Sequence, residues 1–270
     1  MNIRPTFQRV ELEAIRELRE RYLDGLLKGQ EALLEVLVPH AEPYAILAKG
    51  ETAGYFIVHE GNVLIEYFVT DEYLAYTHNF LREFIALKRI RSALVKSFDH
   101  MFLACAMDVQ VGVRSKGVLV RDYIPRKLPE IPSIRYTQRT ATEEDLPRVK
   151  AVDQPVFTHP ERLRAVIRGG CMRLFEHEGR VVGFGIIRPI IPGRPEVDLG
   201  IAVDRPFRNK GHAIYILRDM AEYCAAHGLE ATAGCSIENW ASIKMGLRVG
   251  FVSFYRLLEL SFPEPGFRPS

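Results

Sequence analysis

The sequence contains few cysteines, and their spacing argues against folds held together by disulfide bonds or by cysteine-bound metal ions. Only 4 cysteines occur among 270 residues, and no two of them form a Cys-x-x-Cys pair. A disulfide framework and a cysteine-based zinc site are therefore not expected, and a reducing cytoplasm fits this composition. We accordingly expect no metal centre and a cytoplasmic location.

Long apolar runs and an excess of one charge are also missing. No run approaches the roughly 18 apolar residues of a membrane span, and residues 1–5 lead into a charged helical pattern rather than a secretory segment. The 36 Lys and Arg residues are balanced by 34 Asp and Glu residues, which leaves a net charge of +2. We therefore expect no nucleic-acid or membrane partner. The pattern Gly-x-x-x-x-Gly-Lys-[Ser/Thr] is absent as well, which excludes that class of nucleotide-binding site.

What the sequence does contain is an internal repeat. A turn followed by a strand is predicted at Gly50 and again at Gly179, and a second glycine follows each turn, at Gly54 and Gly183. Both pairs of glycines are separated by 129 positions. The repeat predicts that the two halves share one fold.

Later features of the two halves match in the same order. A strand ending in aspartate is followed by a helix, then by an apolar strand containing cysteine, and then by a closing strand that opens with glycine. The matched pairs are Asp71 and Asp204, Cys105 and Cys235, and Gly117 and Gly250. This order favours a duplication, the alternative being that any two α/β halves look alike at this level.

A proline-rich stretch separates the halves. Residues 124–133 hold three prolines and three charges, which is typical of an extended connector. We therefore expect an N-terminal domain over residues 1–126, a linker over 127–133 and a C-terminal domain over 134–270.

The second half is expected to alternate strands and helices. Thr142 opens a capping-box-like sequence and therefore a helix, and Gly228 stops a later one. The expected strands cover residues 134–139, 172–176, 181–189, 197–203, 230–236 and 251–260, and further helices cover 160–167, 211–227 and 241–249.

A basic loop between a strand and a helix carries the clearest chemistry. It is the run Arg208-Asn209-Lys210-Gly211-His212-Ala213, after the strand that ends at Val203. The first backbone N–H groups of a helix lack intrahelical partners, and the helix dipole adds positive charge there. Gly211 allows close approach of the backbone, and Arg208 and Lys210 supply charge. The loop is therefore a candidate site for a phosphorylated ligand.

At this point the chain resembles the GNAT superfamily of acyl-CoA N-acyltransferases. The loop matches the family pattern Arg or Gln-x-x-Gly-x-Gly or Ala, and Asn239-Trp240-Ala241-Ser242 with Gly250-Phe251 matches its later segment. The run that begins at Arg139 and leads into Thr142 looks like the family's first strand-to-helix turn. The resemblance covers about residues 134–263 and implies two tandem α+β (α/β) domains, each with a mixed, mostly antiparallel central sheet flanked by helices.

The first half resembles the family only in architecture. Residues 71–76, Asp-Glu-Tyr-Leu-Ala-Tyr, stand where the loop should be, with no glycine and two carboxylates. Acidic side chains would repel a pyrophosphate. The resemblance therefore implies a degenerate N-terminal copy that has lost cofactor binding, and one cofactor per chain.

The resemblance also implies how acetyl-CoA, or another acyl-CoA, would be held. The loop amides would cradle the pyrophosphate, and the pantetheine arm would pair with the strand over 199–203, splayed from the strand over 230–236. The thioester carbonyl would accept a hydrogen bond from a backbone N–H near residues 201–203. The implied cofactor-binding residues are Ile201, Ala202, Val203, Arg208, Asn209, Lys210, Gly211, His212, Ala213, Asn239 and Ser242.

Several of these residues have a second interpretation. Asn239 and Ser242 contact pantetheine, cap the helix that follows, or do both. The His212 side chain contacts phosphate or faces solvent. Gly200 eases a bulge or a close approach in its strand, or is a packing glycine.

The family commonly carries a glutamate before the loop as a general base. The nearby carboxylates here are Glu196 and Asp198, which strand alternation places on one face. We favour Asp198 because it lies between apolar neighbours, although a hydrogen-bonded structural aspartate is the equal alternative. Where many members carry a tyrosine as general acid, this chain has Gly246.

The expected function is transfer of an acetyl or other short acyl group to the primary amine of a small molecule or peptide, by direct attack in a ternary complex. The alternative is an acyl-CoA-binding sensor or scaffold with little or no turnover. The sequence names neither the acceptor nor the oligomeric state, and it leaves a homodimer open.

Overall fold

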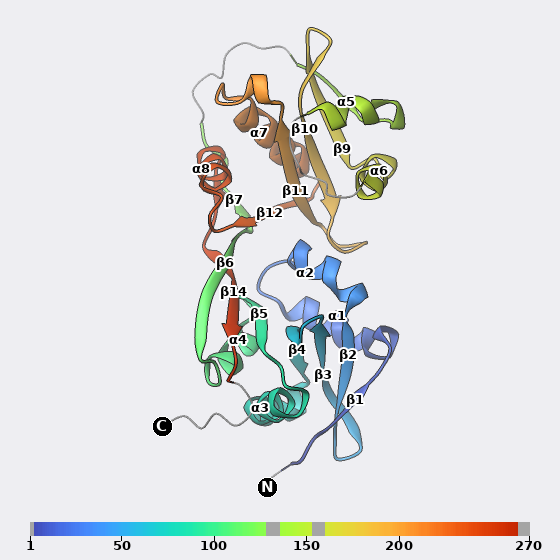
Figure 1. Ribbon diagram of the computed structural model, residues 1–270, viewed down its shortest axis with the longest axis vertical. Coiled ribbons are helices and arrows are strands. Elements are labelled where there is room, and N and C mark those ends of the chain that lie inside the picture. The colour runs from blue at the N-terminus through green and yellow to red at the C-terminus, as the bar shows by residue number, and fades with distance from the viewer. Residues whose placement is uncertain (1–2, 128–135, 153–159, 264–270) are drawn as a thin grey trace. The chain divides into compact units, whose positions relative to one another are not determined.

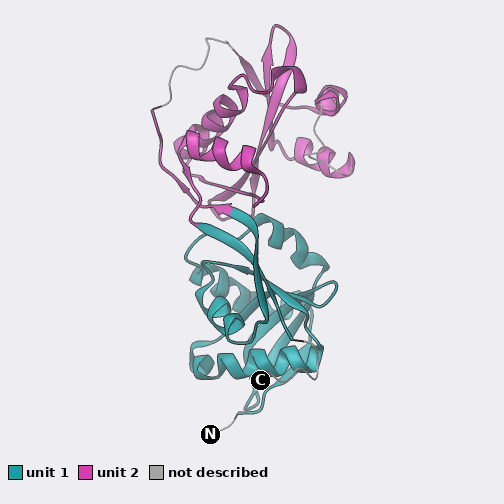
Figure 2. Ribbon diagram, turned by 60° about the vertical axis from the view of Figure 1, so that its left-hand side comes forward, with its two compact units in different colours: residues 1–118, 255–270 teal, residues 119–254 magenta. Residues whose placement is uncertain are grey.

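The computed structural model describes residues 3–127, 136–152 and 160–263. These residues form two compact units, which Figure 2 colours separately. Unit 1 consists of residues 3–118 and 255–263, and unit 2 consists of the described residues between 119 and 254.

Both units contain a hairpin with the same tight turn. Lys49 and Gly50 have φ of 52° and 84°, and Glu178 and Gly179 have φ of 49° and 72°. Two successive left-handed residues are typical of the turns that match the twist of paired strands. The predicted correspondence of the two turns is therefore confirmed.

The second pair of glycines also lies in equivalent places. Gly54 is paired with Val69, and Gly183 is paired with Val203. A Cβ atom at Gly54 would lie 2.1 Å from the carbonyl oxygen of Phe68, and one at Gly183 would lie 2.4 Å from that of Ala202. Only glycine fits so close to the neighbouring strand.

Unit 1 is built on a sheet in the order β1-β2-β3-β4-β5-β14-β6. Its strands are β1 Thr6–Arg9, β2 Glu42–Ala48, β3 Glu51–His59, β4 Val63–Val69, β5 Ser92–Lys96, β14 Tyr255–Ser261 and β6 Gly112–Val120, whose end reaches unit 2. Its helices are α1 Arg16–Gly25, α2 Ala32–Leu37, α3 Thr77–Lys88 and α4 His100–Met107.

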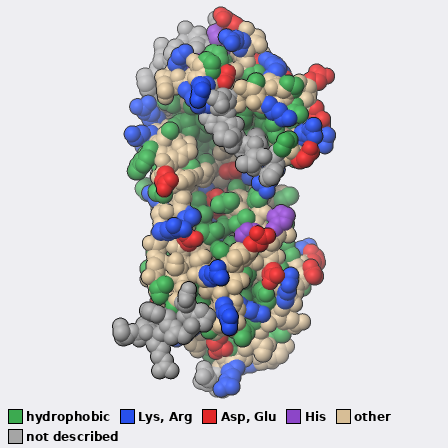
Figure 3. All heavy atoms as spheres, in the orientation of Figure 1, with side chains coloured by type: hydrophobic (Ala, Val, Ile, Leu, Met, Phe, Trp, Pro, Cys, Tyr) green, Lys and Arg blue, Asp and Glu red, His purple; other side chains and the backbone are tan. Residues whose placement is uncertain are grey.

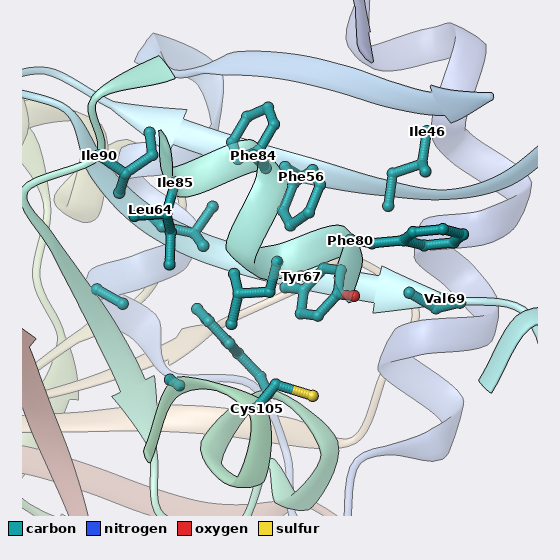
Figure 4. Close-up of a cluster of buried hydrophobic side chains, with 14 of the residues drawn as sticks. Ile46, Phe56, Leu64, Tyr67, Val69, Phe80, Phe84, Ile85, Ile90 and Cys105 are labelled. Atoms are coloured by element: carbon teal, nitrogen blue, oxygen red, sulfur yellow. The ribbon is translucent and has the colours of Figure 1, made fainter. Parts of the chain in front are cut away.

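One face of the unit 1 sheet packs on α3 and α4. Tyr67 and Val69 of β4 meet Phe80 and Phe84 of α3 and Cys105 of α4 in one apolar core (Figure 4). Because strand residues alternate between faces, Glu66, which directly precedes Tyr67, points to the other face, where Arg19 of α1 binds it. The helices α1 and α2 therefore cover the face opposite α3 and α4.

Unit 2 contains a sheet in the order β12-β11-β10-β9-β8, with the end of β6 beside β12, and a small β13–β7 pair. Its strands are β7 Asp122–Tyr123, β8 Thr137–Thr140, β9 Met172–His177, β10 Arg180–Pro189, β11 Glu196–Val203, β12 Glu230–Ser236 and β13 Phe251–Val252. Its helices are α5 Leu146–Ala151, α6 Pro160–Arg168, α7 His212–Ala226 and α8 Trp240–Val249.

The helices of unit 2 also lie on both faces of the sheet (Figure 1). Leu199 and Val203 of β11 pack with α7, whereas Ala202 of the same strand and Ile186 of β10 pack with α5 and α6. The predicted helix stop at Gly228 is confirmed, since this residue has φ of 67° just after α7.

Two parts of the predicted repeat are wrong. Cys105 lies on α4, not on a strand, because Asp99 caps a helix there by accepting a hydrogen bond from the N–H of Phe102 at 3.3 Å. A short apolar run suits a buried strand and a buried helix equally well. Gly117 lies inside β6, which begins at Gly112.

The predicted last strand over residues 251–260 is two strands. β13 pairs with β7 in unit 2, and β14 pairs with β5 in unit 1. The compact units therefore differ from the predicted domains 1–126 and 134–270, because hydrogen bonding of β14 places residues 255–263 in unit 1.

The surface carries charges of both signs. Lys and Arg side chains are interspersed with Asp and Glu side chains on the face that Figure 3 shows. This mixture agrees with the net charge of +2.

We expect Leu260→Ala to destabilise unit 1. Leu260 on β14 is fully buried in the unit 1 core, and removal of a buried leucine side chain costs about 2–5 kcal/mol. Leu87→Ala is the control because Leu87 is 66% exposed in the same unit. Urea unfolding with proteolytic mapping of the unit that opens measures both variants, and equal stabilities would contradict the assignment of β14 to this core.

Candidate functional site

The candidate site of unit 2 starts where two parallel strands part. β11 and β12 pair at Glu196–Glu230, Val197–Ala231 and Asp198–Thr232. Thr232 is buried, and its hydroxyl donates to the carbonyl of Val197 at 3.0 Å. Residues 199–203 continue to pair with β10, but their ladder with β12 has ended. The two strands are therefore paired only at the start of β11.

The basic loop follows directly at that end of β11. The N–H of Asp204 donates to the carbonyl of Val182 at 2.9 Å, and the Asp204 carboxylate accepts from the N–H of Arg205 at 2.8 Å. A single 3-10 turn covers Arg205–Phe207. These bonds fix the direction in which the chain leaves the strand.

Two left-handed residues then shape the loop. Asn209 has φ of 60° and Gly211 has φ of 87°, and α7 begins at His212. The first intrahelical bonds of α7 are donated by Ile214 and Tyr215 to the carbonyl of Gly211. The N–H groups of the first turn are thus the kind of unpaired donors that bind anions at helix N-termini.

The two loop cations are held by the loop itself. The Arg208 Nε atom donates to the carbonyl of Val203 at 3.1 Å, and the Lys210 Nζ atom donates to that of Pro206 at 2.8 Å. Both positive charges therefore stay beside the N-terminus of α7. This arrangement fits the phosphates of an acyl-CoA, although the binding role of each loop residue stays a prediction.

The His212 side chain does not face solvent, so that sequence-based expectation is wrong. It is buried, and its Nδ1 atom is hydrogen-bonded to the Tyr136 hydroxyl. Its ring lies edge-on to that of Phe207, with the two ring centroids 5.6 Å apart. Burial lowers its pKa below the usual value, and Lys210 adds to this effect. A phosphate contact through the side chain or the backbone N–H of His212 stays a prediction.

Asn239 caps α8. Its Oδ1 atom accepts a hydrogen bond from the N–H of Ser242 at 3.1 Å, which confirms the capping interpretation. A contact of Asn239 or Ser242 with pantetheine stays a prediction. Gly246, in the same helix, leaves space: a Cβ atom there would meet only the Cβ atom of Phe251, at 3.7 Å.

Asp198 lies at the point where β11 and β12 part. It is directly opposite Arg188 of β10, and the Arg188 Nη2 atom donates to Asp198 Oδ2 at 3.3 Å. Both side chains are partly exposed, 40% for Arg188 and 27% for Asp198. Glu196 is the first residue of β11 and lies farther from the loop.

Gly200 makes no bulge. The β10–β11 register is unbroken from Gly183–Val203 to Pro189–Val197. A Cβ atom at Gly200 would be at ordinary contact distance, 3.5–4.0 Å, from Ile186. The bulge interpretation of Gly200 is therefore wrong, and the residue leaves space on the face that carries α5 and α6.

Unit 1 lacks this loop geometry. The N–H of Thr70 donates to the carbonyl of Ala53 at 2.9 Å, as Asp204 does to Val182. A 3-10 helix over Asp71–Tyr76 then runs straight into α3, with no left-handed residue between them. Loss of cofactor binding in unit 1 stays a prediction, which this geometry supports.

Arg188 and Tyr136 are not among the residues that the sequence predicts for the site. Strand alternation could have placed Arg188 near Asp198 only if the hairpin register had been known. Tyr136 precedes β8, and its contact with His212 joins segments that are 76 positions apart. No local pattern indicates such a pair.

Two absences apply to the described residues only. Over residues 3–127, 136–152 and 160–263, no three His, Cys, Asp or Glu side chains are grouped as metal ligands are. None of the helices in these ranges is both long and apolar enough to cross a membrane.

Comparisons with known proteins match both halves of the chain. A model described as an acetyltransferase (GNAT) domain matches residues 11–123, and one for the acetyltransferase (GNAT) family matches residues 136–251. No curated protein sequence matches the chain.

Several solved structures share the fold. An acetyltransferase of the GNAT family from Colwellia psychrerythraea has a TM-score of 0.84 at 18% identity, over 96% of this chain and 100% of that one. A tandem GNAT protein from the clavulanic acid biosynthesis pathway has a TM-score of 0.60 at 15% identity, over 98% and 100%. A GCN5-related N-acetyltransferase from Sphaerobacter thermophilus has a TM-score of 0.58 at 16% identity, over 97% of each chain.

We expect His212 to stay neutral at a pH where an ordinary histidine is half protonated. Its lowered pKa means that the unfolded chain takes up a proton first as the pH falls below about 6.5. The stabilising contribution of His212 is therefore present above that pH and is lost as the pH falls. An NMR titration of the histidine rings, assigned with His212→Phe and with the exposed His227→Phe as control, tests this. A His212 midpoint at or above 6.5 would contradict it.

Proposed function

The chain belongs to the GNAT acetyltransferase family, with two of its domains in tandem, and we propose that unit 2 is the acyl-CoA-dependent N-acyltransferase. The observation that carries this proposal is the parting of β11 and β12 beside the loop at residues 208–213. Such a parting gives an extended thioester a strand edge to lie on and an anion site for its phosphates.

The distances along the strand suit this ligand. Val203 lies five positions after Asp198, which corresponds to roughly 17 Å of strand. A chain anchored by its phosphates at the loop and lying along β11 would bring its far end to the point where the strands part. The acyl-CoA supplies the activated acyl group there, and acetyl-CoA is the form that we propose.

Asp198 is the proposed general base, acting on the acceptor directly or through water. It removes a proton from the ammonium of a primary amine, so that the nitrogen lone pair can attack the thioester carbon. The new bond is N–C and the bond that breaks is C–S. The attacking nitrogen gives up its second proton to solvent as the amide forms, and the sulfur leaves as a thiolate that takes up a proton from solvent. A backbone N–H on the part of β11 that has no β12 partner would stabilise the oxygen on which negative charge develops.

Gly246 supports a second candidate function, an acyl-CoA-binding sensor. The position provides no hydroxyl to protonate the leaving thiolate, which favours an acyl-CoA-binding sensor with little turnover. A thiol has a pKa of roughly 8.5, so its thiolate can leave without an acid, and we therefore favour catalysis. A thiol-release assay with a panel of amines separates the two, because a sensor would bind acetyl-CoA without releasing CoA to any acceptor.

We expect Gly211→Ala to weaken acetyl-CoA binding. Gly211 has φ of 87°, which a side chain disfavours by about 1–2 kcal/mol, so the substitution distorts the loop. Gly228→Ala imposes the same strain, at φ of 67°, at the other end of α7 and should leave affinity unchanged. Titration calorimetry should give one site per chain and a 10-fold or greater loss for Gly211→Ala only. Two sites, or equal losses, would contradict the proposed site.

We expect Asp198→Asn to lower kcat and to preserve acetyl-CoA affinity. Loss of a general base typically costs a factor of about 10²–10⁴ in rate. Glu196→Gln is the matched control and should lower kcat less than 10-fold. Steady-state kinetics over a range of pH measures both. A larger loss for Glu196→Gln would assign the base to Glu196, and unchanged rates in both would place it elsewhere.

A further inference from the structure

The ion pair beside the proposed reaction point is unusually loose. Arg188 and Asp198 touch through one contact of 3.3 Å and are both partly exposed. In the same unit, Arg139 binds Asp145 through two contacts of 2.6 Å each. A guanidinium has five N–H donors, and the contact with Asp198 uses one of them. A second carboxylate can therefore bind Arg188 in the bidentate geometry that guanidinium groups favour.

There is room for such a carboxylate on the same face. Asp198, Gly200 and Ala202 alternate onto the face of α5 and α6, and Gly200 brings no side chain to it. A Cβ atom at Gly200 would meet no atoms nearer than those of Ile186. Arg188 and Gly200 are diagonal neighbours on the two paired strands, a separation of roughly 7–8 Å that a long side chain spans.

In unit 1, a side chain fills the position that corresponds to Gly200. Ile57 in unit 1 and Ile186 in unit 2 are equivalent, because each lies three residues after the matched glycine of its hairpin. The strand partner of Ile57 is Glu66, and that of Ile186 is Gly200. The Glu66 carboxylate is fully buried and accepts from Arg19 at 2.8 and 3.0 Å. At the position that is open in unit 2, unit 1 thus holds a carboxylate bound to an arginine.

These observations, together with the proposed transferase function on which the inference rests, lead to a class of acceptor. We propose that the acceptor amine carries a carboxylate, as an amino acid does, and that Arg188 binds this carboxylate over Gly200 while the amine nitrogen faces Asp198. The acceptor's carboxylate replaces Asp198 on Arg188, and the released Asp198 oxygen then accepts a proton from the acceptor's ammonium. An amine without a carboxylate has no group that can replace Asp198 on Arg188, so the ion pair between Arg188 and Asp198 stays in place.

The acceptor preference of the full chain tests the inference. The twenty common amino acids and their carboxamides serve as acceptors with acetyl-CoA, and CoA release gives kcat/KM for each pair. We expect the best amino acids to exceed their amides by about 10- to 100-fold, which is what a charge-assisted hydrogen bond contributes. Arg188→Gln should reduce this ratio to near 1, and Arg188→Lys, which keeps the charge and loses the fork, should retain part of it.

Arg162→Gln is the matched control, since Arg162 is exposed on α6 and should keep the full ratio. Acetyl-CoA affinity, measured for every variant, verifies that unit 2 is folded. Amides that are acetylated as well as amino acids would overturn the inference and leave the transferase function standing, as would an unchanged ratio in Arg188→Gln. If acetyl-CoA binds and no member of either set is acetylated, the proposed transferase function fails and the inference fails with it.

Discussion

The parting of two parallel strands is the constraint on which both units depend. In unit 2, β11 and β12 pair only up to Asp198 and Thr232, and in unit 1, β4 and β5 pair only at Val63–Ser92 and Leu64–Ala93. Backbone groups that lose a ladder partner need another one when they are buried. Other groups therefore have to lie between or beside the parted strands of each unit, and these groups differ between the two units.

Unit 1 provides its own side chains. Lys96 at the end of β5 is almost fully buried, and its Nζ atom donates to the Tyr22 hydroxyl at 2.6 Å and to Gln30 Oε1 at 2.8 Å. The Gln30 amide in turn donates to Glu66 at 2.8 Å. Burial lowers the pKa of Lys96, which Asp99 opposes. Removal of one partner from such a network typically costs about 3–5 kcal/mol, so this region of unit 1 is a fixed part of its structure. Unit 2 has Gly200 in place of Glu66, so no carboxylate of its own fills the corresponding position.

The sequence was sufficient to predict the features that depend on local backbone conformation. The loop at Gly211 and the paired turns at Gly50 and Gly179 require left-handed residues, and glycine at fixed spacing reports them directly. The features that the sequence could not show depend on contacts between segments that are far apart in the chain. The buried His212 relies on Tyr136, and the position of β14 relies on β5, which no short pattern encodes. The contact between Arg188 and Asp198 requires the strand register, which a shift of one residue would remove.

The position of β14 has a consequence for how the protein is made. This strand lies between β5 and β6 in the sheet of unit 1, yet it is synthesised after every other strand of the described residues. While the ribosome is still translating unit 2, the N-terminal sheet has an open place with unpaired edges on both sides. Such edges invite pairing with other chains, and a nascent chain grows by only about 5–20 residues per second. The N-terminal unit therefore begins to fold first and is completed last, and a ribosome that stalls within the second half leaves the first half incomplete.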